Sequence, residues 1–272
     1  MDAQLRGSSH PQLYPMWVIR MSHLLGLQRL PNHQELKAAG LIVERTALDY
    51  TIFVSHQWLG SQHPDPTGAQ FRVLQEAFQR MIAGEMQVEL DIPMQLNGFS
   101  RSLTGADREH LENACVWLDW FSIPQFATED HLDAVRDETQ LAVESIPFYV
   151  ESCQLFVALV PPMLHHDSLE ECGYTTWLQR GWCRLEIWCN LLSHYDDAPF
   201  IVIHEEDYAE FAMPVHWVHD SPQDGVFAVE SDRQRVSNVM RKAYDSKLCS
   251  LDGQSEKLDL HRYLVAGHHR VL

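Results

Sequence analysis

Basic residues are scarce in this chain. Its 272 residues include 20 lysines and arginines against 38 aspartates and glutamates, which gives a formal net charge of -18 with neutral histidines. An excess of negative charge repels both the phosphate backbone of nucleic acids and the anionic surface of membranes. The composition therefore predicts that neither a nucleic acid nor a membrane is the main partner.

Long apolar runs are also missing. No stretch reaches the roughly 18 residues that a membrane-spanning helix requires, and the first residues lack the charged, apolar and small-residue succession of a secretory signal. The chain is nevertheless 45% hydrophobic, which is enough to build a full core. We therefore expect a soluble, cytoplasmic protein with one elaborated domain, or one domain plus an appendage.

Paired cysteines and phosphate-binding glycine motifs are absent from the sequence. The six cysteines are irregularly spaced and form no CxxC pair, so neither a disulfide framework nor a zinc site is predicted and the thiols are expected to be reduced. The glycines form neither GxGxxG nor GxxxxGK followed by Ser or Thr. This absence excludes the usual phosphate loops of Rossmann dehydrogenases and P-loop enzymes.

Three separated blocks are the most informative segments that are present. They read YTIFVSHQW at 50–58, CVWLDWFSIPQ at 115–125 and RGWCRLEIW at 180–188, and in each an apolar run ends in polar residues. Such runs are typical of buried parallel strands, whose C-terminal ends deliver side chains to the edge where open α/β sheets bind ligands. The polar residues of the blocks are therefore candidate site residues.

Strand-like and helix-like segments alternate along the chain, which favours an α/β protein built from βαβ units. Five strands are expected, at 51–55, 90–93, 114–121, 155–160 and 200–204. Apolar residues at helical spacing predict helices at 71–82, 131–152 and 182–194, and Pro147 should kink or end the second of these. The expected organisation is an N-terminal helical extension at 1–45, an α/β domain at 46–210 and a C-terminal appendage at 211–272.

The blocks resemble the signatures of the TIR (Toll/interleukin-1 receptor) domain, a module of innate immune receptors, plant resistance proteins and bacterial defence proteins. The resemblance covers roughly residues 48–205 and implies a flavodoxin-like, parallel five-stranded sheet flanked by helices. Two departures are visible: Thr51 stands where the family usually has Asp, and the segment between Tyr174 and Trp182 is several residues longer than usual. The matching segments are Tyr50 to Ser55, Val116 to Asp119, Tyr174 to Thr176, and the W-C-x-x-E stretch from Trp182 to Glu186.

The resemblance to catalytic TIR domains implies cleavage of NAD, with Glu186 as the catalytic residue. Nicotinamide leaves as a neutral ring, so the reaction needs no general acid on the leaving group. A single carboxylate could stabilise the oxocarbenium-like charge that grows on the ribose. The implied products are nicotinamide and either ADP-ribose or a cyclic ADP-ribose, in immune, defence or cell-death signalling. NAD would be a substrate, and no cofactor is expected.

Four further residues are candidate substrate-binding residues: Ser55, His56, Asp119 and Trp182. Ser55 and His56 leave the end of the first strand and could reach a phosphate or ribose, although strand-end residues of these types also serve in turns. Asp119 could lie near the ribose or cap the following turn. Trp182 lies four residues before Glu186 on the same helical face and could stack on a ring of the nucleotide, or belong to the core.

The sequence also allows other chemistry and other functions. Cys183 could act as a thiol nucleophile but is more typical of a buried thiol, and Arg184 is expected in a surface ion pair. Two clusters could bind a metal but lack a known ligand spacing: His165, His166 and Asp167, and His216, His219 and Asp220. The alternative functions are a non-catalytic TIR-like scaffold that acts by self-association, and a hydrolase or transferase that cleaves nucleoside N-glycosidic bonds.

Overall fold

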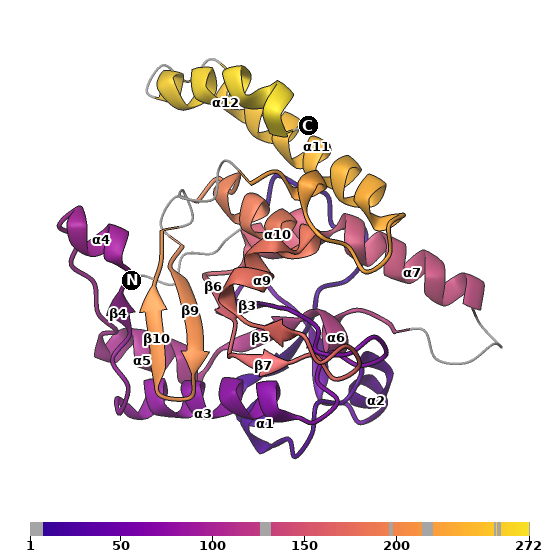
Figure 1. Cartoon of the computed structure of the whole chain (residues 1–272), viewed down its shortest axis with the longest axis vertical. Helices are drawn as coiled ribbons and strands as arrows, with labels where there is room; N and C mark the ends of the chain where they lie inside the picture. The colour runs from indigo at the N-terminus through magenta and orange to yellow at the C-terminus, as the bar shows by residue number, and fades with distance from the viewer. Residues whose placement is uncertain are drawn as a thin grey trace.

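The computed structural model describes residues 8–125, 132–195, 198–213, 220–252, 254 and 257–271. It confirms an α/β fold, with a mostly parallel, mixed sheet flanked by helices (Figure 1). The sheet has eight strands in the order β2-β1-β5-β3-β6-β9-β10-β4. Within these residues, no helix combines the length and apolar character needed to span a bilayer. The eight strands are β1 (Trp17–Arg20), β2 (Ile42–Glu44), β3 (Thr51–His56), β4 (Glu89–Leu90), β5 (Cys115–Leu118), β6 (Leu155–Leu159), β9 (Phe200–Glu205) and β10 (Tyr208–Phe211). A separate two-stranded sheet pairs β7 (Met163–Leu164) with β8 (Glu171–Cys172).

Four neighbouring strands, β5, β3, β6 and β9, run parallel at the centre of the large sheet. They correspond to four of the five strands expected from the sequence. Every residue of β3 and β6 is buried, because helices cover both faces of the sheet and leave no polar side to alternate with. The carboxyl ends of these strands consequently reach the same edge.

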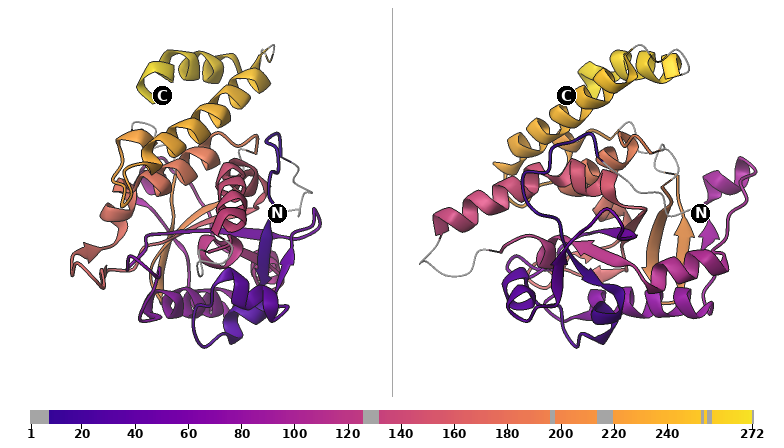
Figure 2. Two further views of the ribbon diagram at one scale, coloured as in Figure 1. Left: turned by 90° about the vertical axis from the view of Figure 1, so that its right-hand side faces the viewer. Right: turned by 180° about the vertical axis from the view of Figure 1, so that it is seen from behind.

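Helices cover both faces of this sheet. One apolar cluster joins Phe53, Trp117 and Phe156 to the side of the sheet that carries α8 (Ile146–Ser152), α9 (Tyr174–Gln179), α10 (Gly181–Leu191) and α11 (Asp232–Leu251). A second cluster joins Ile52, Val54 and Val157 to the side that carries α1 (Met21–Gly26), α3 (Ala69–Ala83) and α5 (Gly105–Glu112). The chain also forms α2 (His33–Ala38), α4 (Ile92–Leu96), α6 (Asp119–Ser122), α7 (Leu132–Glu144), a short 3-10 turn at Pro222–Asp224 and α12 (Leu258–Val271). Figure 2 shows α11 and α12 as a hairpin that extends outward from the α10 side of the body.

The N-terminal segment, expected as a helical extension, also contributes two strands to the sheet. β1 pairs antiparallel with both β2 and β5. The two strands have four and three residues, too few to generate a clear period-2 pattern, and they depend on pairing with β5 rather than on local preference. The strand β10 after β9 was also absent from the sequence expectation.

Several element boundaries differ from the sequence expectation for local reasons. The prediction of a strand at 90–93 is wrong for residues 91–93. Asp91 accepts a hydrogen bond from the Met94 amide at 2.7 Å and caps α4 there. The strand expected at 114–121 ends at Leu118, where Asp119 begins α6. The helix expected at 131–152 breaks at Ser145 into α7 and α8, with Pro147 in the first turn of α8, where its missing amide hydrogen costs nothing.

The start of α10 is packed against the segment that precedes α11. The Val226 amide donates to the Gln179 carbonyl at 2.6 Å, and the Gly181 amide donates to the Val226 carbonyl at 3.1 Å. A Cβ added to Gly225 would lie 2.5 Å from the Cα of Gly181, so only glycine allows the two backbones this separation.

Substitution Gly225→Ala should therefore destabilise the protein by about 1–3 kcal/mol, the usual cost of overpacking a well-packed contact. Gly105→Ala is the matched control, since a Cβ at Gly105 meets nothing within 4 Å and the residue begins α5. Urea unfolding of both variants tests this expectation. Equal stability of the two variants would contradict it.

Candidate functional site

The candidate site lies at the carboxyl end of β3, where residues from three elements converge. Ser55 and His56 are consecutive on β3, so their side chains point to opposite faces of the sheet. Ser55 meets Glu186 of α10, and His56 meets Asp119 at the start of α6. The site thus consists of two hydrogen-bonded pairs on either side of one strand end.

Glu186 is held by a short hydrogen bond to Ser55. The distance from Ser55 Oγ to Glu186 Oε2 is 2.5 Å, and Trp177 Nε1 donates to the same Oγ at 3.0 Å. Burial raises the pKa of Glu186 to about 8; the Ser55 hydrogen bond and His56 oppose the rise, and the charge of Asp119 adds to it. At neutral pH the carboxyl group is therefore mostly protonated, and a modest change in its surroundings would ionise it.

The hydrogen bonds of the buried His56 side chain indicate that its imidazole ring is protonated. Its Nε2 lies 2.8 Å from Asp119 Oδ1 and its Nδ1 lies 2.8 Å from Gln70 Oε1. The amide of Gln70 is oriented by its Nε2, which donates to the Gln57 carbonyl at 3.2 Å, so the atom facing His56 is the oxygen. Both ring nitrogens face acceptors and both must donate, which requires the imidazolium form.

The pKa shifts of His56 and Asp119 agree with this geometry, since both favour the charged forms. Burial alone would lower the pKa of His56, but the charge and hydrogen bond of Asp119, with the hydrogen bond of Gln70, together raise it. Burial would raise the pKa of Asp119, yet His56, the Trp58 indole and the Trp120 amide lower it. Trp58 Nε1 donates to Asp119 Oδ2 at 2.8 Å. Asp119 is therefore an ionised carboxylate with three donors.

The sequence-predicted residues Ser55, His56, Asp119 and Glu186 are brought together, whereas Trp182 contacts a different element. The indole Nε1 of Trp182 donates to Asp232 Oδ2 of α11 at 3.2 Å. A ring of the substrate would compete with α11 for this tryptophan, so a stacking role for Trp182 stays a prediction.

Ordinary structural roles are found for Arg184, for Cys183 and for the histidine cluster that lies within the described residues. Arg184 lies 3.6 Å from Asp220, as expected for an ion pair, and also donates to the Leu178 and Ser221 carbonyls. Burial raises the pKa of the Cys183 thiol well above its usual value, which suits an unreactive thiol. His166 contacts Asp167 at an exposed position. Among the described residues no three metal-binding side chains gather; His216 and His219 lie outside that part of the chain.

Three site residues were not found from the sequence: Trp177, Trp58 and Gln70. Trp58 belongs to the first polar block and follows β3 by two residues, so its position was a usable signal. Gln70 lies in the first turn of α3, where nothing local distinguishes it from a surface glutamine. Trp177 lies in the lengthened segment after Tyr174, which folds into the short helix α9.

Thr51, which stands where TIR domains usually have Asp, has a structural role. Thr51 begins β3 and is fully buried. Its hydroxyl accepts a hydrogen bond from Arg45 Nε at 3.1 Å, and its amide donates to Gln154 Oε1 at 2.8 Å. A threonine satisfies this environment without a charge, at the end of β3 opposite to Glu186.

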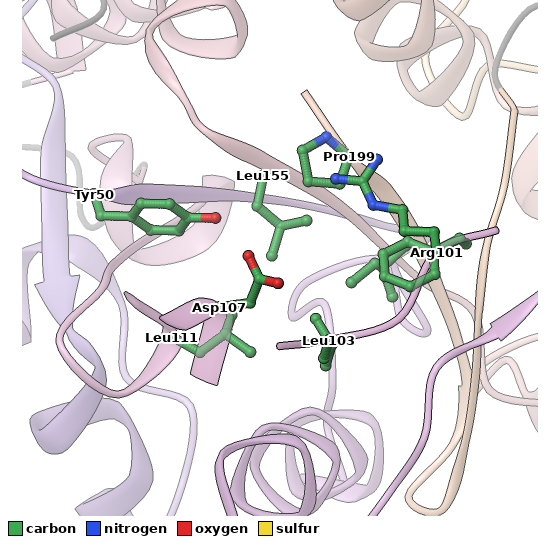
Figure 3. Close-up of a pocket in the computed structure, with 9 residues that line it drawn as sticks. Tyr50, Arg101, Leu103, Asp107, Leu111, Leu155 and Pro199 are labelled. Atoms are coloured by element: carbon green, nitrogen blue, oxygen red, sulfur yellow. The ribbon is translucent and has the colours of Figure 1, made fainter. Parts of the chain in front are cut away.

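Two hollows in the structure lie away from Glu186. The first lies at the amino ends of the parallel strands and has a volume of about 10 Å³, with room for at most one water molecule. Figure 3 shows side chains that line it. The second lies on the outer side of α10, beside Trp188 and Asp220. Glu186 lines neither of them. The residues around the first cavity are Tyr50, Arg101, Leu103, Asp107, Leu111, Leu155, Pro199, Ile201 and Phe211.

Comparison of the chain with models of protein families, with curated proteins and with solved structures finds no match. The interpretation of the site therefore depends on its own geometry and on the sequence signatures.

Proposed function

We propose that this protein is an NAD glycohydrolase of TIR type, with Glu186 as the catalytic carboxylate. The observation that carries the proposal is the position of Glu186. Its carboxyl group is hydrogen-bonded to Ser55 at the carboxyl end of a central parallel strand, beside the charged His56–Asp119 pair. Ligands of open α/β sheets bind at this edge.

The order of the parallel strands supports a flavodoxin-like, TIR-like interpretation of the fold. Numbered along the chain, the parallel strands β3, β5, β6 and β9 occur in the spatial order 2-1-3-4, which agrees with the first four positions of the flavodoxin-like order 2-1-3-4-5. In that order the chain first adds a strand on one side of the first strand, here β3, and then adds the later strands on its other side, so the strand order reverses at β3. Ser55 and His56 therefore lie at the topological switch point.

The proposed reaction begins with departure of nicotinamide from the anomeric carbon of the ribose. The ring takes the bonding electron pair and leaves as a neutral molecule, and positive charge develops on the ribose. Ionised Glu186 would stabilise this charge more strongly than it stabilises bound NAD, which is the requirement for catalysis. Water would then bond to the anomeric carbon and release a proton to solvent, which gives ADP-ribose, or a ring nitrogen of the adenine of the same molecule would bond to that carbon and close a cyclic ADP-ribose.

The positive nicotinamide ring also offers a means of ionising Glu186. A cation next to a carboxyl group lowers its pKa, and NAD carries such a charge until the glycosidic bond breaks. Asp119, already ionised by His56, is available to hydrogen-bond substrate hydroxyls because its side chain is 30% exposed. The two carboxyl groups thus have separate roles, one held as an anion and one ionised on binding.

The reaction should depend on pH through Glu186. Because its pKa is raised to about 8 and the ionised form is required, kcat/KM for NAD should fall as pH decreases through this value and level off above it. Nicotinamide release measured from pH 5.5 to 9.5, with enzyme-free blanks to subtract alkaline decay of NAD, tests this. An activity maximum near pH 5 would contradict the assigned role.

The primary test is incubation of the purified chain with NAD, followed by chromatography of nicotinamide and ADP-ribose products. Assays over a range of protein concentrations are needed, because a TIR-like enzyme is expected to self-associate to complete its site. Nicotinamide riboside and inosine assayed in parallel separate an NAD-cleaving enzyme from a nucleoside hydrolase or transferase. Release of nicotinamide from NAD with little turnover of the nucleosides supports the proposal.

A non-catalytic TIR-like scaffold is the second candidate function. It is favoured by one observation, that Glu186 lines neither of the two hollows. A scaffold would self-associate in the cytoplasm without consuming NAD. Self-association measured by light scattering, without nicotinamide release at any protein concentration, would favour the scaffold.

A further inference from the structure

The helix α9 is attached to the end of β3 by two side-chain hydrogen bonds. Trp177 Nε1 donates to Ser55 Oγ at 3.0 Å, and Thr176 Oγ1 donates to Gln57 Oε1 at 2.7 Å. The Gly173 amide donates to the Thr176 hydroxyl at 2.8 Å and holds that side chain at the start of α9. The added residues between Tyr174 and Trp182 are therefore part of the site rather than a peripheral loop.

The indole of Trp177 has a fixed orientation. Its side chain is fully buried, and its ring stacks on Tyr174 at 6.1 Å and meets Phe200 edge to face at 6.4 Å. A large buried ring in such packing cannot turn without displacing its neighbours. The N–H group of Trp177 is consequently held toward Ser55.

Hydrogen counting shows what this N–H group does to Ser55. An indole nitrogen can only donate, so the Ser55 oxygen must accept from Trp177. The single hydroxyl hydrogen of Ser55 is then free to point at Glu186, which it meets at 2.5 Å. The Ser55 oxygen accepts from Trp177 while its hydrogen is donated to Glu186 Oε2. A carboxyl group protonated on Oε2 would have to donate to that same occupied oxygen, so the arrangement favours acceptance by Oε2, and such a bond is strongest when the carboxyl group is ionised.

We propose that Trp177 is a positioning residue that directs the Ser55 hydroxyl at Glu186 and so favours the ionised carboxylate on which NAD cleavage depends. The inference rests on the proposed function for its catalytic consequence. The hydrogen-bond arrangement itself can be tested without turnover. A hydroxyl that accepts a hydrogen bond is also a stronger donor, so the indole reinforces the bond from Ser55 to Glu186.

Substitution Trp177→Phe removes the N–H donor and keeps an aromatic ring in the packing. The acid limb of the pH profile of kcat/KM should move to higher pH by about 0.5 to 1 unit, the size expected for loss of one ordinary hydrogen bond between neutral groups. Activity at pH 7 should consequently fall by roughly three- to tenfold and recover at high pH. The matched control is Trp188→Phe on α10, because the Trp188 indole is also buried but donates to the Asp220 carbonyl at 2.9 Å.

A second measurement follows the ionisation of the Glu186 carboxyl group directly. In protein labelled with ¹³C-carboxyl glutamate, the NMR signal of Glu186 is identified by its loss in Glu186→Gln, and its titration midpoint is followed in wild type, Trp177→Phe and Trp188→Phe. The midpoint should rise in Trp177→Phe alone. Melting temperatures confirm that each variant is folded.

The outcomes separate this inference from the proposed function. An unchanged midpoint in Trp177→Phe overturns the inference, as does a loss of activity that is equal at every pH, because a purely structural role gives that result. If wild type releases no nicotinamide, the proposed function fails. The carboxyl titration then still decides whether Trp177 controls the charge of Glu186.

Discussion

Glu186→Gln should reduce nicotinamide release by at least about a hundredfold, the effect typical of removing one group that stabilises transition-state charge. Glutamine keeps the size and shape of the side chain and can still accept the hydrogen bond that Ser55 donates at 2.5 Å. It cannot carry the negative charge opposite the developing oxocarbenium ion. The measurement is nicotinamide release from NAD above pH 8, where wild-type Glu186 is ionised.

Glu205→Gln is the matched control for this substitution. Glu205 ends β9 on the same sheet and is exposed, so its loss removes the same unit of charge without touching the site. Activity close to wild type is expected for this control. Equal turnover by wild type and Glu186→Gln would remove the catalytic assignment and leave the scaffold function.

Asp119→Ala should have the largest effect on stability, about 3 kcal/mol at pH 6, because breaking a buried ion pair leaves the remaining charge uncompensated. The His56 side chain is only 2% exposed and lies 2.8 Å from Asp119. Asp167→Ala is the control, because Asp167 also contacts a histidine, His166, but both side chains are about half exposed. Urea unfolding should show a large loss for the first variant and a smaller loss for the second, which gives up an exposed ion pair and two hydrogen bonds from Ser61.

The cost of Asp119→Ala should depend on pH in a defined direction. The pKa of His56 is raised in the folded state, so its contribution is complete below an unfolded pKa of about 6.5 and is lost as pH rises through the higher folded value. The pKa of Asp119 is lowered, so its contribution is present above about 3.9 and is lost as pH falls through the lower folded value. The difference between wild type and Asp119→Ala should therefore be largest between these limits and smaller at pH 9. A difference that stays constant from pH 6 to pH 9 would show that His56 is neutral in the fold.

The parallel centre of the fold could be predicted from the sequence because its strands are buried on both faces. Continuous apolar runs such as TIFVS and LFVALV, each ended by a proline or a polar block, are typical of strands covered by helices on both sides. The marginal strands could not be predicted in this way. β1, β2 and β10 have three or four residues each, and their existence depends on partners that are distant in sequence.

The candidate site could be predicted where its residues end strands or fall in a family-like motif, and not where tertiary packing selects the residue. Ser55 and Asp119 were identified because polar groups that end apolar runs are conspicuous, and Glu186 because the W-C-x-x-E stretch resembles a TIR signature. Trp177 was missed because a tryptophan in a helical segment is most often a core residue, and the sequence does not reveal that its N–H group reaches Ser55. Gln70 was missed because its role arises from the position of His56 across from α3.

Both edges of the large sheet are formed by very short strands. β2 has three residues and β4 has two, so each edge exposes only a few backbone groups for pairing with another chain. Growth of an assembly by strand addition needs a longer row of such groups. If copies of this protein associate, we therefore expect them to meet through helices and loops, and the assembly should be sensitive to side-chain substitutions on those surfaces rather than to changes at the sheet margins.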